Sequence, residues 1–200
     1  MSRHLSDPFV KQAQKDGYRS RSAYKLIQLN DKDRFLHPNT LVVDLGAAPG
    51  GWSQVAGRLV GRKGKVVATD ILPMDALPNV EFVQGDFTDE TVLAQVMAAL
   101  GGQKADVILS DIAPNLSGID SSDQAKSMYL VELALDMARR TLKSGGTFVA
   151  KVFQGVGSEQ FLKDVRRSFA KVHIRKPDAS RSESREVYFV AKEFKPGEGT

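Results

Sequence analysis

Short apolar runs alternate along the chain with longer amphipathic segments. The runs have the length and β-branched content of buried strands, and they lie at residues 40–45, 65–70, 80–84, 106–110 and 146–153. The segments between them show helical periodicity, at about 50–61, 88–100, 122–143 and 158–169. This regular alternation of strand and helix predicts an α/β fold, doubly wound around a mostly parallel sheet.

The two ends of the chain depart from the alternation. Residues 8–16 and 20–30 show helical patterns ahead of the first strand. Two further strands, at 171–175 and 186–191, follow each other with only a loop between them. A loop too short for a crossover helix indicates that one of these strands runs antiparallel, and we assign this to the last strand.

The length of 200 residues and the absence of a low-complexity linker predict one domain. We expect a basic helical extension, a core and a frayed tail, at residues 1–39, 40–192 and 193–200. The clearest helix, 122–143, has an apolar stripe, and we expect Gly145 and Gly146 to end it.

The composition excludes several kinds of chemistry. The chain has no cysteine, which removes disulfides, zinc–cysteine sites and cysteine nucleophiles. His4, His37 and His173 are scattered, so we predict no bound metal. No apolar run approaches the roughly 18 residues of a membrane span, and the N-terminus has no signal-peptide pattern. We therefore expect a soluble cytoplasmic protein with no membrane partner.

Positive charge is concentrated in two flanking regions. Residues 1–39 and 163–186 each hold 8 Lys/Arg against 4 Asp/Glu, so each contributes +4 to a net charge of +4. This segregation is typical of proteins that hold a polyanion at both flanks. Solvated surface lysines give the same composition, and charge alone leaves both interpretations open.

The loop after the first strand, DLGAAPGGWS at residues 44–53, is rich in glycine. In doubly wound sheets a ligand lies at the carboxyl ends of the strands, where glycine lets the backbone approach it closely. The spacing is not G-x-G-x-x-G, and Pro49 stands where a dinucleotide fold needs a free backbone, which disfavours a nicotinamide-dependent oxidoreductase. No G-K-[ST] follows, which excludes a P-loop.

Carboxylates at the ends of the next strands favour a nucleoside ligand. Asp70 ends the second strand, where an acidic side chain can accept from ribose hydroxyls, and Asp86 ends the third, near the expected adenine edge. Trp52 either walls this pocket or is a core aromatic of the first helix. The candidate nucleoside-binding residues are Gly46, Gly50, Trp52, Asp70, Asp86 and Asp111.

Four motifs together resemble the FtsJ family of RNA ribose 2′-O-methyltransferases: DLGAAPGGWSQ, SDIAPNLSG, AKVFQG and SRSESREVY. The likeness extends from residue 7 to about residue 191. It implies the seven-stranded class I methyltransferase sheet, with S-adenosylmethionine as methyl donor and no metal. Within the family, the bacterial large-subunit rRNA enzymes are most similar, which implies a uridine ribose in assembled or nearly assembled large subunits as the substrate.

Two alternatives remain open at this stage. Members of the family that modify the tRNA anticodon loop share the SRSAYKLIQLN region, at residues 20–30. The other alternative is an RNA-binding assembly factor with a degenerate methyltransferase fold. In such a protein larger residues would replace the glycines of the first loop, and this sequence keeps them.

The residues also limit which atom is methylated. Methylation of pyrimidine C5 needs a cysteine, which this chain does not have. Methylation of a base amine usually relies on an Asp/Asn-Pro-Pro-aromatic motif, whose aromatic ring stacks on the base. The SDIAPN motif at 110–115 has one proline and no aromatic residue. A hydroxyl acceptor is left as the best candidate, and a ribose hydroxyl needs a positioned base. Lys151 lies in an apolar strand, where an ammonium must be paired or partly neutral, and Asp111 is expected beside it.

The resemblance adds two residues from the flanks. By themselves, Lys25 and Glu186 have the pattern of solvated charges. The Lys-Asp-Lys-Glu tetrad of the family falls in order and spacing on Lys25, Asp111, Lys151 and Glu186, with Lys151 as the proton acceptor.

RNA is the expected partner of the basic flanks, and we expect the protein to be a monomer. The candidate phosphate-binding side chains are Lys11, Lys15, Arg19, Arg21, Arg175, Lys176, Arg181 and Arg185. The polar segment 177–185 is either a mobile loop that binds phosphates or an ordinary exposed loop.

Overall fold

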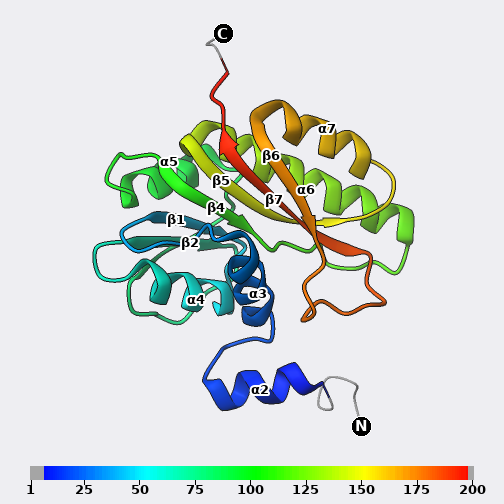
Figure 1. The fold of residues 1–200 in the computed structure, drawn as a ribbon, viewed down its shortest axis with the longest axis horizontal. Coiled ribbons are helices and arrows are strands. Elements are labelled where there is room, and N and C mark those ends of the chain that lie inside the picture. The colour runs from blue at the N-terminus through cyan, green and yellow to red at the C-terminus, as the bar shows by residue number, and fades with distance from the viewer. Residues whose placement is uncertain (1–6, 198–200) are drawn as a thin grey trace.

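The computed structural model describes residues 7–197 and is built around a seven-stranded sheet, whose strands are drawn as arrows in Figure 1. The strands are β1 (Leu41–Leu45), β2 (Lys65–Asp70), β3 (Val80–Gln84), β4 (Ala105–Ser110), β5 (Leu142–Phe153), β6 (Phe169–Arg175) and β7 (Glu186–Phe194). The helices are α2 (Pro8–Asp16), α3 (Ala23–Asp33), α4 (Gly51–Val60), α5 (Glu90–Ala99), α6 (Asp120–Thr141) and α7 (Ser158–Ser168).

The strand order is β3-β2-β1-β4-β5-β7-β6. β1 to β5 pair in parallel, whereas β7 lies antiparallel between β5 and β6. The expected α/β class and the antiparallel last strand are therefore confirmed. The order reverses between β1 and β4, and at such a point the loops after two neighbouring strands separate and leave space for a ligand.

Each face of the sheet has its own apolar core. On one face α3 and α4 pack against residues that include Val42, Leu109 and Tyr188. On the other face α5, α6 and α7 cover a larger cluster that includes Ile108 and Phe148 (Figure 1). The strands of the sheet centre are buried on both faces, which explains their continuous apolar runs.

The junction between α6 and β5 differs from the prediction. The helix ends at Thr141, and Leu142 already pairs with Ala105 as the first residue of β5. Gly145 and Gly146 therefore lie inside the strand, where the register with β4 shifts, rather than at the end of the helix. A Cβ on Gly146 would stand 2.9 Å from the carbonyl oxygen of Lys143 and 3.1 Å from that of Asp106, so crowding by the irregular start of β5 and by β4 explains this glycine.

The C-terminal boundary also differs from the expected one. β7 continues to Phe194, whose buried ring packs against Phe169 with 5.3 Å between the ring centroids. Residues 193 and 194, expected in a frayed tail, thus belong to the sheet. Residues 198–200 of that tail and residues 1–6 of the extension lie outside the described residues. Among the helices of residues 7–197, none has both the length and the apolar character needed to cross a membrane.

Candidate active site

Lys151 and Asp111 meet at the carboxyl end of the central strands. Asp111 follows the last residue of β4, and Ser110 pairs with Ala150, which places Lys151 of β5 beside it. The Lys151 Nζ lies 3.4 Å from Asp111 Oδ1, and their side chains are 9% and 15% exposed. A partly buried ammonium is thus paired with a carboxylate, as its burial requires.

Glu186 connects this pair to the N-terminal extension. It begins β7, opposite Phe153 of β5, and its Oε2 lies 4.0 Å from Lys151 Nζ. Its Oε1 accepts a 2.7 Å hydrogen bond from Lys25 Nζ of α3 and a 2.8 Å bond from Ser180 Oγ. The structure therefore brings together Lys25, Asp111, Lys151 and Glu186 from four separate segments of the chain. Their catalytic roles remain predictions.

Tyr188 is a member of this cluster that the sequence analysis missed. Its hydroxyl donates a 2.7 Å hydrogen bond to Asp111 Oδ1, and the residue pairs directly with Lys151 across the two strands. Because strand side chains alternate, residue 188 faces the same side as Glu186, and this period of two is the signal in the sequence. The Tyr188 hydroxyl orients the carboxylate that contacts Lys151.

The electrostatics of the cluster favour an ionised glutamate and a neutral tyrosine. Burial by itself raises the pKa of Glu186, but the Lys25 hydrogen bond and the charges of Lys25 and Lys151 outweigh it and lower the pKa overall. Burial, together with the Asp111 and Glu186 charges, raises the pKa of Tyr188 well above its ordinary value. Tyr188 is therefore a hydrogen-bond donor, and Glu186 is an anion that accepts a hydrogen bond from Lys25 and faces Lys151.

A small cavity of about 60 Å³ adjoins the cluster at the switch point of the sheet. Asp111 forms part of its wall. The rest comes from Ser20 and Ser22 ahead of α3, and from the end of β1, the loop after it and the start of α4, including Asp44, Gly46 and Trp52. Gly46 has a φ of 69°, and a Cβ there would lie 2.5 Å from the Ile112 side chain. A Cβ on Gly51 would collide with the Ser20 hydroxyl. The glycines thus let the loop pack closely against Ile112 and Ser20, and the loop forms a narrow cradle beside Asp111.

Asp44 also lines this cavity, and it is the second residue, after Tyr188, that the sequence analysis did not select. It is almost fully buried at the end of β1, and Ser53 Oγ donates a 2.7 Å hydrogen bond to it. Burial raises the pKa of Asp44 to about 7; the Ser53 hydrogen bond lowers it, while the charges of Asp111 and Asp70 raise it further. A cation bound in the cavity would favour the charged form of this carboxyl.

Asp70 and Asp86 lie at the strand ends where they were expected. The Asp70 carboxylate accepts hydrogen bonds from the amides of Ala48 and Leu72, both 2.9 Å, so it also fixes the glycine-rich loop. Asp86 is exposed and accepts from the amide and hydroxyl of Thr88 in a local turn. Both carboxylates retain lone pairs toward solvent.

Gly50 and Trp52 are held by the N-terminal extension. Arg19 Nη1 donates to the carbonyl oxygen of Pro49 at 3.0 Å, and a Cβ on Gly50 would lie 2.9 Å from that nitrogen. The Trp52 indole donates to the Ser22 carbonyl at 2.8 Å, and its ring centroid lies 5.7 Å from that of Tyr188. Trp52 is thus a core aromatic whose surface also lines the cavity.

Several of the candidate phosphate-binding arginines are already engaged within the protein. Arg175 makes two hydrogen bonds to the Asp33 carboxylate, of 2.8 and 2.9 Å. Arg21 lies 2.9 Å from Asp7 Oδ2 and donates to the Ala179 carbonyl. Their positive charge serves the attachment of the extension, whereas Lys11 and Lys15 are exposed on α2, which projects from the body (Figure 1).

The loop between β6 and β7 is only half exposed. Ala179 and Ser180 are buried beneath it, while residues 181–183 face solvent. Lys176 Nζ crosses the loop and donates to the carbonyls of Ser184 and Glu186. The loop therefore positions Ser180 against Glu186, while phosphate binding by its exposed arginines, Arg181 and Arg185, stays a prediction.

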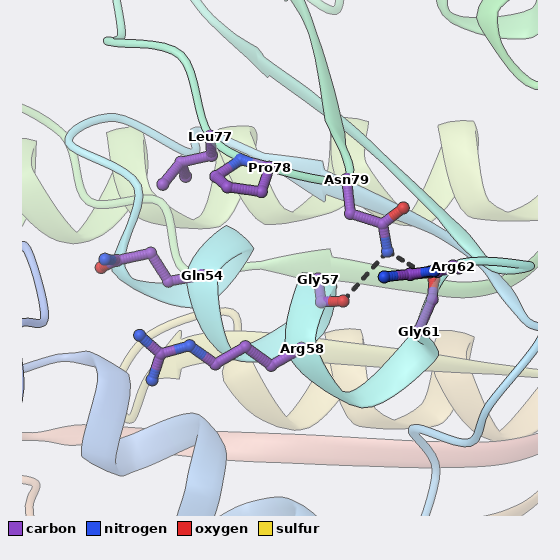
Figure 2. Close-up of a pocket in the computed structure, with 8 residues that line it drawn as sticks. All are labelled: Gln54, Gly57, Arg58, Gly61, Arg62, Leu77, Pro78 and Asn79. Carbon is purple, nitrogen blue, oxygen red and sulfur yellow. Dashed lines mark hydrogen bonds between the residues drawn. The ribbon is translucent and has the colours of Figure 1, made fainter.

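A cavity of about 480 Å³ lies away from these residues, between α4 and the segment that leads into β3 (Figure 2). Gln54 and Arg58 border it from the helix, and Leu77 borders it from the opposite segment. Asn79 bridges the two by a 3.0 Å hydrogen bond to the Gly57 carbonyl. No candidate nucleoside-binding or tetrad residue lines it.

The chain matches known proteins over nearly its whole length. The family model described as FtsJ-like methyltransferase matches residues 18–194. "Ribosomal RNA large subunit methyltransferase E" of Stutzerimonas stutzeri is 66% identical over 195 residues, covering 98% of this chain and 95% of that protein. The protein of the same name from Marinobacter nauticus is 64% identical over 195 residues, covering 98% and 94%.

The fold comparison agrees. A solved structure described as a ribosomal RNA methyltransferase from Plasmodium falciparum is 34% identical and has a TM-score of 0.80. It covers 88% of this chain, and this chain covers 98% of it. The match of the family model, these identities and the shared sheet leave one assignment: this chain is a methyltransferase of the FtsJ-like family.

Proposed function

We propose that this protein transfers a methyl group from S-adenosylmethionine to the 2′-hydroxyl of a ribose in large-subunit rRNA, a uridine ribose in the late-assembling or assembled subunit. The observation that carries the proposal is the position of the tetrad, directly beside the glycine-lined cavity at the switch point of a methyltransferase sheet. The names of the relatives at 66% and 64% identity support large-subunit rRNA as the substrate.

The cavity suits S-adenosylmethionine by its chemistry. Asp44 and Asp111 line the cavity and offer carboxylates to a cationic ligand, while Asp70 and Asp86, which lie at the ends of the next strands outside this cavity, offer acceptors to a nucleoside. S-adenosylmethionine, when bound, supplies a methyl group on a positively charged sulfur. The cradle residues, Asp44, Gly46 and Asp111 among them, would hold the cofactor, and Asp111 links this cradle to Lys151.

The tetrad then acts on the acceptor hydroxyl. A ribose hydroxyl is a weak acid, and its proton must leave as the oxygen is methylated. Lys151 Nζ is the proposed proton acceptor, and Asp111, fixed by Tyr188, sets its position. Lys25 and Glu186 complete the cluster: their 2.7 Å hydrogen bond holds the Glu186 carboxylate beside Lys151, which accepts the proton as a neutral amine. Alignment of the oxygen with the methyl group supplies much of the acceleration.

The proposed substrate also defines the partner and the place of action. The partner is RNA within the large ribosomal subunit, held through phosphates by basic residues such as Lys11 and Lys15. We place the enzyme in the bacterial cytoplasm, where large subunits are assembled, and propose that it acts as a monomer.

The test is methyl transfer from labelled S-adenosylmethionine to undermodified large subunits, free large-subunit rRNA and bulk tRNA in parallel. Lys151→Ala serves as the blank. The proposal predicts label in the ribosomal sample alone. Label in tRNA alone would replace it by a tRNA enzyme, and binding of RNA without binding of S-adenosylmethionine would replace it by an assembly factor.

A further inference from the structure

Two arginines border the cavity of about 480 Å³ between α4 and the segment 75–79 (Figure 2). Arg58 belongs to the last turns of α4 and Arg62 follows its end, and both side chains are exposed. Among the described residues that line the cavity none is acidic, and within residues 7–197 neither arginine forms an ion pair. The cavity therefore has a positively charged wall, and the sequence analysis did not select either arginine.

Arg58 is held in a position that leaves its hydrogen-bond donors available. Its guanidinium carbon lies 4.9 Å from the centroid of the Tyr18 ring. Tyr18 in turn packs edge-on against Tyr24, with 5.5 Å between the ring centroids. A guanidinium that packs on an aromatic ring uses its flat face, while its N–H groups point outward in the plane and suit the oxygens of a phosphate.

The wall opposite α4 is largely apolar. Leu77 and Pro78 face the helix across the cavity (Figure 2). Asn79 fixes the separation of the two walls by its 3.0 Å hydrogen bond to the Gly57 carbonyl. A cavity of this size, basic on one side and apolar on the other, fits a phosphate together with the sugar that carries it.

The cavity shares a boundary with the cofactor cradle. A Cβ on Gly50 would lie 3.1 Å from Leu77 Cδ1, so Leu77 packs directly against the glycine-rich loop. Arg19, whose other contact with this loop is described above, donates to the carbonyls of Asp75 and Ala76 at 2.8 and 2.9 Å. The apolar wall is thus tied to the loop that forms the cradle.

The positive charge of α2 adjoins the same cavity. Gln54, which borders the cavity, donates from Nε2 to the carbonyl of Gly17, the residue that caps α2, at 3.1 Å. Lys15 stands in the last turn of α2 and is exposed. The Asp16 carboxylate beside it accepts a 2.6 Å hydrogen bond from the Tyr24 hydroxyl. Basic groups that follow one another over a surface are typical of a site for a polyanion.

We propose that this cavity binds a phosphodiester of the substrate RNA outside the target nucleotide, with Arg58 and Arg62 on the phosphate oxygens and Leu77 and Pro78 against the sugar. The inference rests on the proposed function. Gly51 lines the cradle, and α4 rises about 10 Å from Gly51 to Arg58, which is the length of about three stacked nucleotides. The bound phosphate therefore belongs to a neighbouring stretch of the RNA. Because phosphates carry no sequence information, the cavity supplies affinity and register rather than choice of base.

The test compares three double variants with the wild type. Arg58→Gln with Arg62→Gln removes both charges from the cavity, and Arg58→Lys with Arg62→Lys keeps them. Lys104→Gln with Lys195→Gln removes two charges from exposed lysines that lie outside both basic flanks. Kd is measured over a series of monovalent salt concentrations for undermodified large subunits and for free large-subunit rRNA. Calorimetry gives the affinity for S-adenosylmethionine.

We expect RNA binding to weaken in the cavity glutamine variant alone. Its Kd at about 0.1 M salt should rise at least about tenfold, and the slope of log K against log salt should become shallower by about 1.8, which is about 0.9 for each lost phosphate contact. The lysine variant should keep the slope of the wild type, because the release of counterions depends on charge. The methylation rate at saturating subunit and the affinity for S-adenosylmethionine should stay unchanged, since no tetrad residue lines the cavity.

An unchanged salt slope in the cavity glutamine variant, or an equal change in either of the other two variants, would overturn the inference while leaving the proposed function intact. A loss of binding confined to assembled subunits, with free rRNA bound as before, would also overturn it, because the cavity would then contact a ribosomal protein. Failure of the wild type to methylate any subunit would refute the proposed function itself.

Discussion

The ion pair between Lys25 and Glu186 attaches the N-terminal extension to the catalytic edge, and breaking it should destabilise the whole protein. The two groups are 2.7 Å apart, and each side chain is only 10% exposed. Removing one partner of such a pair leaves an uncompensated charge and costs about 3–5 kcal/mol. Ser180 and Lys151 still contact Glu186 when Lys25 is lost, which sets the expectation for Lys25→Met at the lower end.

The assay is urea and thermal unfolding of Lys25→Met, Glu186→Leu and the double variant. For a chain of 200 residues, about 3–5 kcal/mol corresponds to a fall in Tm of about 6–20 °C. The double variant should recover most of the loss, because no unpaired charge remains. The pKa of Glu186 is lower in the folded protein than its ordinary value of 4.5. The stabilisation by the pair is therefore fully present above pH 4.5 and is lost as pH falls through the lowered pKa of the folded state.

A single-variant loss under about 1 kcal/mol would refute this reasoning, because it is the value of a solvated surface pair. Strictly additive losses in the double variant would also contradict it, since they would show that Lys25 and Glu186 stabilise the protein independently.

Three further predictions concern catalysis and binding. Lys151→Ala should lower methyl transfer by about 10²–10⁴-fold while calorimetric affinity for S-adenosylmethionine stays nearly unchanged; loss of both would show that Lys151 holds the cofactor. Tyr188→Phe removes the 2.7 Å hydrogen bond to Asp111 and should lower the free energy of unfolding in urea by about 1.5–3 kcal/mol, and an unchanged value would mean that this bond is absent in solution. Because the Asp44 pKa is about 7, affinity for the cationic cofactor should rise with pH up to about 7 and then level off, and a titration series on Asp44→Asn should be flat over that range.

The alternation of apolar runs was sufficient to predict the sheet, because buried strands appear as short continuous apolar runs and the amphipathic helices between them show the 3.6-residue period. The same pattern misplaced the end of α6. Gly145 has a φ of 83°, and Gly146 is crowded by the carbonyls of Lys143 and Asp106, so both glycines are required by the irregular start of β5 rather than by a helix end. A residue pair that is distant in sequence leaves no such local signal.

The candidate site shows the same limit. Asp111 and Lys151 follow from strand order, because parallel neighbours bring their carboxyl ends to one edge. Lys25 and Glu186 look like solvated charges in the sequence, and only family resemblance selected them. Their burial arises from the packing of α3 against the start of β7, 161 positions apart in the chain. Tyr188 was missed although strand periodicity places it on the face of Glu186.

The most direct test of the central claim is the chemical identity of the methylated nucleoside. Undermodified large subunits are incubated with the enzyme and labelled S-adenosylmethionine, and the rRNA is then digested to nucleosides and separated. A tetrad that deprotonates a ribose hydroxyl predicts all label in 2′-O-methyluridine, with none for Lys151→Ala. Label in a base-methylated nucleoside would contradict the assignment of Lys151 and of the ribose acceptor together.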